Sequence, residues 1–599
     1  MLYPIQNEYR LKMSLNGMWD FRLGDEHNPQ QPLHTDTQVS VPASFNDQLA
    51  EETVRLYGGH VWYERMFAVP NYVKQERLVL RFGAVTHEAW VYVNGELIGT
   101  HQGGFLPFEF EMNDFLIAGD NRLTVKVSNL LTKATLPVGT TQLEEFAEGD
   151  FRQKVSENFD FFNYAGIHRS VDLYTTANNY IEDIVLTPSI DFTSNQATIQ
   201  VNTTVVGVYD SIKVTIKDEA GEVVSTIETS EQQQELVIVA PHLWQPLAAY
   251  LYTVDVALLS KGTIIDSYQE KMGIREAKVV GNQFLINQKP FYFTGFGKHE
   301  DTAINGRGYN EVMNVLDIQL MKKMGANSLR TSHYPYSEEM MQLCDREGIV
   351  VIDETPAVGL MENFSTDVSS LDDAKANRTW QVMETQEHHA NVLRELVARD
   401  KNYACVVMWS IANEAATYQW GAYEYFEPLF TLTRTLDTQK RPCTQANIIS
   451  YDPVNNDPCI PLSDVICINR YYGWYIDCGD LEKSRRKLTN ELAQWEEQYP
   501  DKPIMMTEYG AETIAGFHSN VNEPFSEEYQ TAYYALYSEV FDQFENFIGE
   551  QVWNFADFQT RYDTNRVMGN RKGLFTRNRD PKQAVGYLAE RWKKINQIM

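Results

Sequence analysis

Cysteine is scarce in this chain of 599 residues, and no two cysteines have the spacing of a metal-binding pair. The six cysteines are Cys344, Cys405, Cys443, Cys459, Cys467 and Cys478. They are too few and too irregularly spaced for a disulfide scaffold, and none belongs to a Cys-x-x-Cys motif. We therefore expect them to be free thiols that are buried in the protein.

Basic residues and long apolar runs are also in short supply. Lysine and arginine together number 51, against 82 aspartate and glutamate residues, which gives a net charge of −31. Nucleic acids and anionic membranes bind basic surfaces, so we expect neither as a partner. Charged residues interrupt the longest apolar runs before the ~18 residues that a membrane span requires. The N-terminal residues show no basic region followed by an apolar core of about 7 to 15 residues, which predicts a cytoplasmic protein.

Motifs of several catalytic classes are missing as well. The sequence has no G-x-S-x-G nucleophile motif and no glycine-rich phosphate loop. The HQGGF stretch at 101–105 lies in a β-rich region and is interpreted as a turn. His299-Glu300 and His388-His389 lack the HExxH spacing of a zinc site, so structural or substrate-contacting roles are favoured over metal binding.

Two β-rich stretches come first in the chain. Residues 1–180 consist of short alternating runs, such as Met18–Leu23, separated by turn residues. Asn94-Gly95 stands between two such runs and predicts a hairpin, because both residues tolerate a positive φ. Residues 181–274 continue in the same way, with Gly, Asp or Pro at intervals of about 10 residues. We predict a jelly-roll β-sandwich over 1–180 and an immunoglobulin-like β-sandwich over 181–274.

The remaining stretch, 275–599, alternates short apolar runs with helical patterns, which is typical of a parallel sheet. In its first helical pattern, one helical face is expected to carry Val312, Val315, Leu316, Leu320 and Met324. Strands are expected at 291–295, 327–330, 348–353, 406–411, 442–446, 465–469, 504–507 and 549–553. Eight such units in about 325 residues predict a (β/α)8 TIM barrel with insertions.

Two of the expected barrel strands end in a glutamate. The fourth leads to Asn413-Glu414, and the seventh leads to Glu508. Catalytic residues of a TIM barrel lie at the C-terminal ends of its strands. Two carboxylates there suit cleavage of a glycosidic bond, because one group must protonate the leaving oxygen and another must attack or activate water. For either glutamate alone, an ion pair with a neighbouring lysine or arginine is the alternative.

Aromatic residues follow two other strands. NRYYGWY, at 469–475, comes after the sixth strand, and Trp553-Asn554-Phe555 comes after the eighth. Aromatic rings pack against the flat apolar faces of sugars, while Asn and Tyr bind sugar hydroxyls. Core packing is the alternative for each ring, but seven polar and aromatic residues in succession would make a poor core segment. We therefore predict a sugar site at this end of the barrel.

Several motifs together resemble the bacterial β-glucuronidases of glycoside hydrolase family 2, and the resemblance covers the whole chain. The motifs are DFFNYAGIHR at 160–169, TSHYP at 331–335, SIANE at 410–414, NRYYGWY at 469–475, TEYG at 507–510 and QVWNFADF at 551–558. The resemblance implies a jelly-roll domain, an immunoglobulin-like domain and a catalytic TIM barrel. It also implies retention of configuration, with Glu414 as acid/base and Glu508 as nucleophile, their carboxyl groups about 5 to 5.5 Å apart. These two carboxylates suffice for the reaction, so neither a cofactor nor a catalytic metal is expected.

Asn570-Arg571-Lys572 resembles the Asn-x-Lys motif of glucuronidases, in which an amide and an ammonium hold the carboxylate of the sugar. An exposed basic turn is the alternative. By the same resemblance, Arg566 lies nearby and adds positive charge. The residues implied to line the sugar pocket are Asp160, His333, Asn413, Asn469, Tyr471, Tyr475 and Trp553. Asp160 would reach the barrel mouth from the first domain. The resemblance further implies small-molecule glucuronide substrates and a homotetramer.

Some alternatives and departures remain. A β-galactosidase or β-mannosidase of the same family would keep the chemistry and change the sugar, and a catalytically inactive carbohydrate-binding protein would keep only the scaffold. Ala415 stands where the family usually has a proline, which removes a fixed φ but no carboxylate. The stretch 360–380 is longer than the usual βα loop of about 2 to 6 residues. In related enzymes a loop here overhangs the site; disorder is the alternative.

Overall fold

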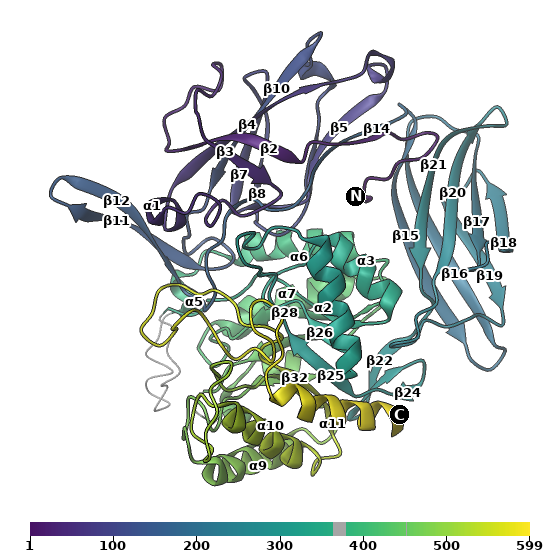
Figure 1. The fold of residues 1–599 in the computed structure, drawn as a ribbon. Helices are drawn as coiled ribbons and strands as arrows, with labels where there is room; N and C mark the ends of the chain where they lie inside the picture. Colours follow the sequence, from purple (N-terminus) through teal and green to yellow (C-terminus); the bar gives the residue numbers. More distant parts are fainter. Residues whose placement is uncertain (363–378, 451, 599) are drawn as a thin grey trace.

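Alternating apolar and polar residues build the first β-sandwich, which occupies residues 12–176 of the computed structural model (Figure 1). The structure describes residues 1–362, 379–450 and 452–598. One sheet has the strand order β1-β14-β5-β9 and the other β3-β2-β4-β10-β7-β8. These strands are β1 (Lys12–Ser14), β2 (Gly17–Leu23), β3 (Gln38–Val41), β4 (His60–Ala68), β5 (Arg77–Phe82), β7 (Glu88–Val93), β8 (Glu96–Gln102), β9 (Phe108–Glu111), β10 (Asp120–Ser128) and β14 (Val171–Thr176).

Two β-hairpins in this part of the chain lie in different places, one in the sandwich and one that leads to the barrel. Asn94 and Gly95 join β7 to β8 with φ angles of 52° and 87°, so the predicted hairpin is confirmed. A second hairpin, β11 (Gly139–Ala147) and β12 (Asp150–Glu157), projects from the body of the molecule (Figure 1). The chain that leaves β12 runs back to the barrel, and this return brings Asp160 to the barrel mouth.

In most strands of the second β-sandwich, buried residues alternate with half-buried or exposed ones. Its two sheets have the orders β15-β16-β19 and β18-β17-β20-β21. The strands are β15 (Tyr180–Asp191), β16 (Gln196–Val206), β17 (Ser211–Lys217), β18 (Val223–Thr229), β19 (Gln233–Val239), β20 (Tyr252–Ser260) and β21 (Thr263–Met272). Val214 pairs with Val256, and both are fully buried between the sheets. The period of two is what places these side chains on one face.

The third part is a closed parallel barrel, as predicted. After a small sheet of β22 (Ala277–Val280), β23 (Gln283–Ile286) and β24 (Lys289–Pro290), the barrel runs in order from β25 to β32. Its strands are β25 (Phe293–Gly297), β26 (Ser328–Arg330), β27 (Val350–Glu354), β28 (Val406–Asn413), β29 (Cys443–Asn447), β30 (Ile466–Asn469), β31 (Ile504–Glu508) and β32 (Phe547–Val552). Every residue of these strands is buried, because helices cover the outer face and side chains fill the interior.

Helices cover the barrel, and one of them buries only part of its expected apolar face. The longer helices are α2 (Glu311–Met324), α3 (Glu338–Glu347), α6 (Gln386–Asp400), α7 (Ala422–Leu436), α9 (Leu481–Gln498), α10 (Glu527–Phe541) and α11 (Ala584–Ile598). The apolar residues expected on one face of α2 divide between surface and core: Val312 is 77% exposed and Val315 and Leu316 are also exposed, whereas Met324 is buried and Leu320 packs against the core. The buried face also carries Asp317, whose carboxylate pairs with Lys298 at 3.1 Å and with Arg579 at 2.8 Å. Hydrophobic periodicity does not show the whole of this face because a buried ion pair forms part of it.

Two further expectations concern thiols and membrane spans. All six cysteines lie among the described residues as free thiols; five are buried, as expected, whereas Cys478 is exposed. In the part of the chain that the structure describes, no helix combines the length and the apolar character that crossing a membrane requires.

Buried polar contacts hold the three parts together. Arg169, after the segment that carries Asp160, pairs with Glu300 of the barrel at 3.0 Å and donates to the carbonyl oxygen of Pro335 at 2.6 Å. The N-terminal segment lies between the two sandwiches (Figure 1). There Arg10 donates to both carboxylate oxygens of Asp266 on β21, at 2.9 and 2.6 Å. The first contacts attach the first sandwich to the barrel, and the second attach the N-terminal segment to the second sandwich.

Candidate functional site

A cavity of about 190 Å³ lies at the C-terminal ends of the barrel strands. Every site residue predicted from the sequence lines it except Asn570: the lining includes Asp160, His333, Asn413, Glu414, Asn469, Tyr471, Tyr475, Glu508, Trp553, Arg566 and Lys572. Asn570 is fully buried behind the cavity and donates to Asp160 Oδ2 at 3.0 Å. Residues more than 400 positions apart in the sequence therefore meet at one place.

Glu414 follows β28 directly, and its backbone holds the side chain over the cavity. Its φ is 51°, and its backbone N–H donates to the carbonyl oxygen of Ala446 at 2.8 Å. Asn469 donates to Glu414 Oε1 at 3.0 Å. Burial, together with the nearby charge of Glu508, raises the pKa of the Glu414 carboxyl to about 8. Glu414 can therefore carry a proton at neutral pH.

Glu508, the last residue of β31, lies in a different environment. Arg330 Nη2 donates to its Oε1 at 2.5 Å, and the hydroxyl of Tyr471 donates to its Oε2 at 2.6 Å. A guanidinium and a phenol are donors that suit an ionised carboxylate. The site thus places a protonated carboxyl group and a hydrogen-bonded carboxylate around one cavity, which is the arrangement that acid-assisted nucleophilic displacement needs.

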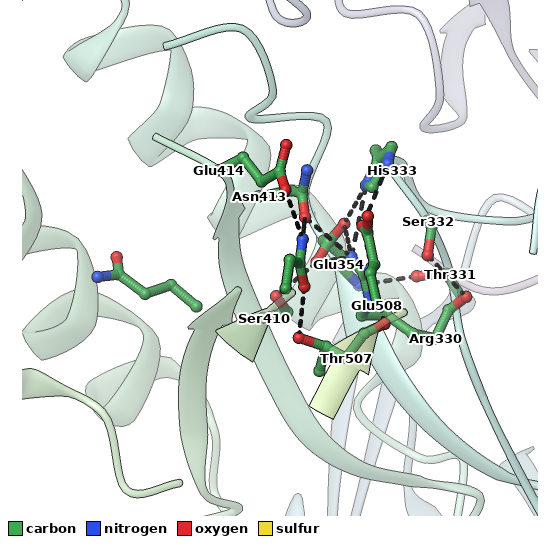
Figure 2. A network of polar contacts seen from close by, with 12 residues as sticks. Arg330, Thr331, Ser332, His333, Glu354, Ser410, Asn413, Glu414, Thr507 and Glu508 are labelled. Carbon is green, nitrogen blue, oxygen red and sulfur yellow. Dashed lines mark hydrogen bonds and ion pairs between the residues drawn. The ribbon is translucent and has the colours of Figure 1, made fainter. Parts of the chain in front are cut away.

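Arg330 and Glu354 complete the network under Glu508, and the sequence analysis did not select either (Figure 2). Both side chains are fully buried, and Arg330 Nη1 lies 2.8 and 2.7 Å from the two Glu354 oxygens. Glu354 also contacts His333 Nδ1 at 3.0 Å. Arg330 ends β26 and Glu354 ends β27. The strand-end rule that selected Glu414 and Glu508 could therefore have found them.

A cluster of charged and polar residues forms the other end of the cavity. Arg566 donates from Nε and Nη2 to the Asp160 carboxylate, with a shortest distance of 2.7 Å. Arg566 Nη2 also donates to the hydroxyl oxygen of Tyr475 at 2.6 Å, and Lys572 Nζ donates to the same oxygen at 2.5 Å. Asp160 thus reaches this cluster from the first sandwich.

Lys572 is fully buried, and its surroundings shift the pKa of its ammonium in opposite directions. Burial and the neighbouring Arg566 guanidinium lower the pKa of its ammonium to about 7. The carboxylate of Glu512, another residue that the sequence analysis missed, opposes this shift; it lies 3.6 Å from Lys572 Nζ and 2.5 Å from Arg566 Nη1. No strand-end pattern points to Glu512, because it lies in the loop after β31.

Apolar side chains complete the wall. The rings of Trp553 and His333 are stacked with centroids 4.8 Å apart, and Phe161 from the first sandwich lies 6.2 Å from His333. Ile448 and Ile449 line another part of the cavity. Such a wall can pack against the flat face of a sugar ring while the polar groups bind its hydroxyls.

Family models match almost the full length of the chain. The models are described as the sugar binding domain of glycosyl hydrolases family 2 for residues 12–177, glycosyl hydrolases family 2 for 179–275, and the TIM barrel domain of that family for 277–597. The chain belongs to glycosyl hydrolase family 2.

Relatives within family 2 are similar over their whole length. A β-glucuronidase from Streptococcus agalactiae serotype V is 47% identical, with 99% of this chain and 98% of that protein covered. A β-glucuronidase from Felis catus is 42% identical, with 100% and 93% covered. Among solved structures, the Ruminococcus gnavus β-glucuronidase has a TM-score of 0.92 at 37% identity, covering 99% of both chains. The Bifidobacterium dentium enzyme complexed with coumarin-3-O-glucuronide has a TM-score of 0.91 at 43% identity, covering 99% and 98%.

The stretch 360–380 of this family 2 hydrolase lies largely outside the described residues, so the predicted overhanging loop stays a prediction. The residues on either side of it are held near Glu414. Ala416 N–H donates to the carbonyl oxygen of Leu360 at 2.9 Å, and Trp380 Nε1 donates to the carbonyl oxygen of Ala416 at 2.9 Å. Both ends of the stretch are therefore attached to the segment that follows Glu414.

The histidines that were weighed as metal ligands make other contacts in this family 2 chain. His299 Nδ1 lies 3.1 Å from the Tyr334 hydroxyl, and His389 Nε2 lies 2.8 Å from the carbonyl oxygen of Ile411. Across residues 1–362, 379–450 and 452–598, no three His, Cys, Asp or Glu side chains are grouped in a way that could hold a metal ion.

Proposed function

We propose that this family 2 enzyme hydrolyses β-D-glucuronides to D-glucuronate and an alcohol, with retention of configuration. The observation that supports this most strongly is that one cavity holds both the Glu414 and Glu508 pair and the cations Arg566 and Lys572. The pair suits glycosidic cleavage, and the cations suit a sugar that carries a carboxylate.

The reaction follows from the two carboxyl environments. Glu508 attacks the anomeric carbon while Glu414 gives its proton to the leaving glycosidic oxygen, so the aglycone departs as a neutral alcohol and a glycosyl ester forms on Glu508. Glu414, now a carboxylate, takes a proton from water, whose oxygen attacks the same carbon and releases Glu508. Two inversions return the original configuration. The pKa of about 8 that burial gives Glu414 supports its first role, because the group enters the reaction protonated.

The carboxylate of the sugar is assigned to the part of the cavity that Arg566 and Lys572 line. Lys572 and Arg566 line the cavity there, and their donors suit an anion where a neutral hexose would place a hydroxymethyl group, while Asn570 supports this part from behind through its hydrogen bond to Asp160. Asp160, His333, Asn413, Asn469, Tyr471, Tyr475 and Trp553 are proposed to contact the rest of the sugar.

An aryl β-glucuronide tests the activity directly. The wild-type protein should release the phenol, and Glu508→Gln should reduce release at least a thousandfold, since the nucleophile is lost. A 2-fluoro glucuronide should label Glu508 covalently, which a carbohydrate-binding protein without activity would not allow. Release no faster than that of Glu508→Gln would exclude the proposed function.

Lys572→Ala tests the identity of the sugar. A charge-assisted bond contributes about 1.5 to 3 kcal/mol, so glucuronide kcat/KM should fall at least tenfold. Turnover of a neutral aryl galactoside or mannoside, where measurable, should fall much less. Equal losses on both substrates would contradict the assignment of Lys572 to the carboxylate and would favour a galactosidase or mannosidase.

Three wider properties belong to the same proposal. Family membership supports a homotetramer, which sedimentation should reveal as a particle of four chains; a monomer would contradict it. The unpaired thiols support a cytoplasmic location, testable by cell fractionation. Domain limits at residues 180 and 274 are supported by the hydrophobic cores, since one extends from Leu15 to Leu173 and the next is drawn mainly from Ile181 to Ile274.

A further inference from the structure

Glu512 lies behind the carboxylate-binding end of the cavity without lining it. Its side chain is 2% exposed, and one oxygen, Oε1, faces both cations: Arg566 Nη1 at 2.5 Å and Lys572 Nζ at 3.6 Å. Both cations line the cavity, whereas Glu512 does not. The carboxylate therefore contacts the cations from the side away from the substrate.

The loop that carries Glu512 is fixed at its backbone. Thr513 N–H donates to the carbonyl oxygen of Arg571 at 3.0 Å, and Gln530 Nε2 donates to the carbonyl oxygen of Ala511 at 3.1 Å. Glu512 is thus attached to the 570–572 segment, and it follows the nucleophilic residue Glu508 by only four positions. One loop joins the group that attacks the sugar to the group that holds its carboxylate.

We infer that Glu512 is a positioning residue that sets uronate specificity, holding Arg566 and Lys572 together as a charged pair that a substrate carboxylate can bind. This inference rests on the proposed function and extends it. Two buried cations repel each other, and a shared carboxylate between them offsets that repulsion. Without it, Lys572 Nζ would keep the Tyr475 hydroxyl as its hydrogen-bond partner but would lose its nearest carboxylate.

If Glu512 only repelled the substrate carboxylate, removing its charge would change substrate binding in the direction opposite to the one that our inference predicts. If its negative charge only opposed the incoming carboxylate, removing the charge would tighten binding. If it keeps Lys572 protonated, removing the charge would weaken binding near neutral pH, because Lys572 would lose its proton more easily. The titratable and charged groups that face Lys572 are Arg566, Glu512, Asp160, Glu508, Tyr471 and Tyr475. The two accounts therefore predict changes in opposite directions.

The test uses Glu512→Gln, which keeps the shape and removes the charge, and Glu512→Asp, which keeps the charge on a shorter side chain. The probes are D-glucaro-1,5-lactone and D-glucono-1,5-lactone, which are tested as competitive inhibitors and differ only in carrying a carboxylate or a hydroxymethyl group. Glu512→Gln should raise the inhibition constant of D-glucarolactone about tenfold or more and that of D-gluconolactone less than about threefold. Glu512→Asp should recover part of the difference.

Kinetics on an aryl glucuronide give a second measurement. KM should rise in Glu512→Gln while kcat changes less than about threefold, and the alkaline fall of kcat/KM should move to lower pH. Glu338→Gln is the matched control, because Glu338 is also a buried partner of an arginine, Arg81 at 2.8 Å, but lies outside the cavity. This control should leave both inhibition constants and KM unchanged.

Three results would overturn the inference: tighter binding of D-glucarolactone by Glu512→Gln, equal changes for the two lactones, or an unchanged KM with an unchanged pH profile. Should Glu512→Gln fail to fold, Glu512→Asp carries the same test, with a smaller rise expected for D-glucarolactone alone. Failure of the proposed function would look different, because the wild-type protein itself would then release no phenol from the aryl glucuronide.

Discussion

Glu414 and Glu508 are chemically identical side chains whose surroundings give them different states. Glu414 is half-buried and accepts a hydrogen bond from the neutral amide of Asn469, which leaves it able to hold a proton. Glu508 receives the guanidinium of Arg330 and the phenol of Tyr471. Since a retaining glycosidase needs one protonated and one ionised carboxyl group, these contacts support the proposed roles of Glu414 as the acid and Glu508 as the nucleophile.

Glu414→Ala should separate the acid role from the nucleophilic role. General acid catalysis contributes about a hundred- to ten-thousandfold, so kcat/KM should fall by that amount for a glucuronide with an alkyl aglycone. An aryl glucuronide with an acidic phenol should lose far less, because its leaving oxygen hardly needs a proton. The measurement is kcat/KM across a series of phenols of decreasing pKa. Equal loss for all leaving groups would contradict the acid role of Glu414.

kcat/KM should fall at alkaline pH because two residues of the site lose their protons. The buried Lys572 ammonium has a pKa of about 7 and the Glu414 carboxyl a pKa of about 8. Both groups act in the protonated form, so kcat/KM should be highest below pH 7 on this limb and should decrease as the pH rises through 7 and 8. In Lys572→Ala the remaining fall should centre on Glu414. A profile that stays flat to about pH 9 would contradict both assignments.

At the scale of elements, the strand ends and one returning segment build the site. The barrel strands present Arg330, Glu354, Asn413, Asn469 and Glu508 at a common edge because parallel strands end at the same side. The segment after β12 brings Asp160 to that edge from outside the barrel. Phe162 N–H donates to the carbonyl oxygen of Gln559 at 2.9 Å, and farther along Arg169 attaches the same segment to Glu300 and Pro335 of the barrel.

Arg169→Ala should loosen this segment and weaken substrate binding together. Removing one partner of a buried ion pair costs about 3 to 5 kcal/mol, so thermal unfolding should begin at a lower temperature. KM for a glucuronide should rise because Asp160 would no longer be held against Arg566. Arg152→Ala is the control: its pair with Asp150 is exposed on the β11–β12 hairpin and should matter little. Unchanged KM in a destabilised Arg169→Ala would disprove the link to the site.

At the scale of the whole molecule, the two sandwiches and the barrel form one continuous body whose interfaces contain buried charges. The N-terminal segment illustrates this: the Tyr3 hydroxyl donates to Glu339 of the barrel helix α3 at 2.8 Å, and Tyr268 of β21 donates to the carbonyl oxygen of Tyr3 at 2.9 Å. The same segment reaches the second sandwich through Arg10 and Asp266. Ten residues thus connect all three parts.

Arg10→Ala should reduce stability without reducing activity. The Asp266 carboxylate would remain buried without its partner, at a cost of about 3 to 5 kcal/mol. Calorimetry should therefore show an earlier unfolding transition, while kcat and KM at moderate temperature stay as in the wild type because the cavity is untouched. Lys154→Ala, which removes an exposed ion pair with Glu144, should leave the transition in place. An unchanged transition in Arg10→Ala would contradict a stabilising role for the pair.

The sequence by itself determined most of the strands, because a buried strand is an uninterrupted or alternating apolar run that needs no distant information. The run before Glu414 and the run 504–507 before Glu508 appear in the structure within one or two residues of the predicted limits. The same reasoning selected both glutamates. Resemblance to known motifs, rather than any periodicity, pointed to Lys572 and Asp160.

Only the tertiary structure decided how charges are paired. Arg566 meets Asp160 across 406 sequence positions, and Arg330 meets Glu508 across 178. Buried charges are stable only beside a partner, and that partner is supplied by whichever segment the fold brings near, so no local pattern identifies it. For this reason, neither the buried Asp317 on α2 nor Glu512 was predicted from the sequence. The local order of apolar residues determines the strands, and electrostatic pairing between distant residues determines the site.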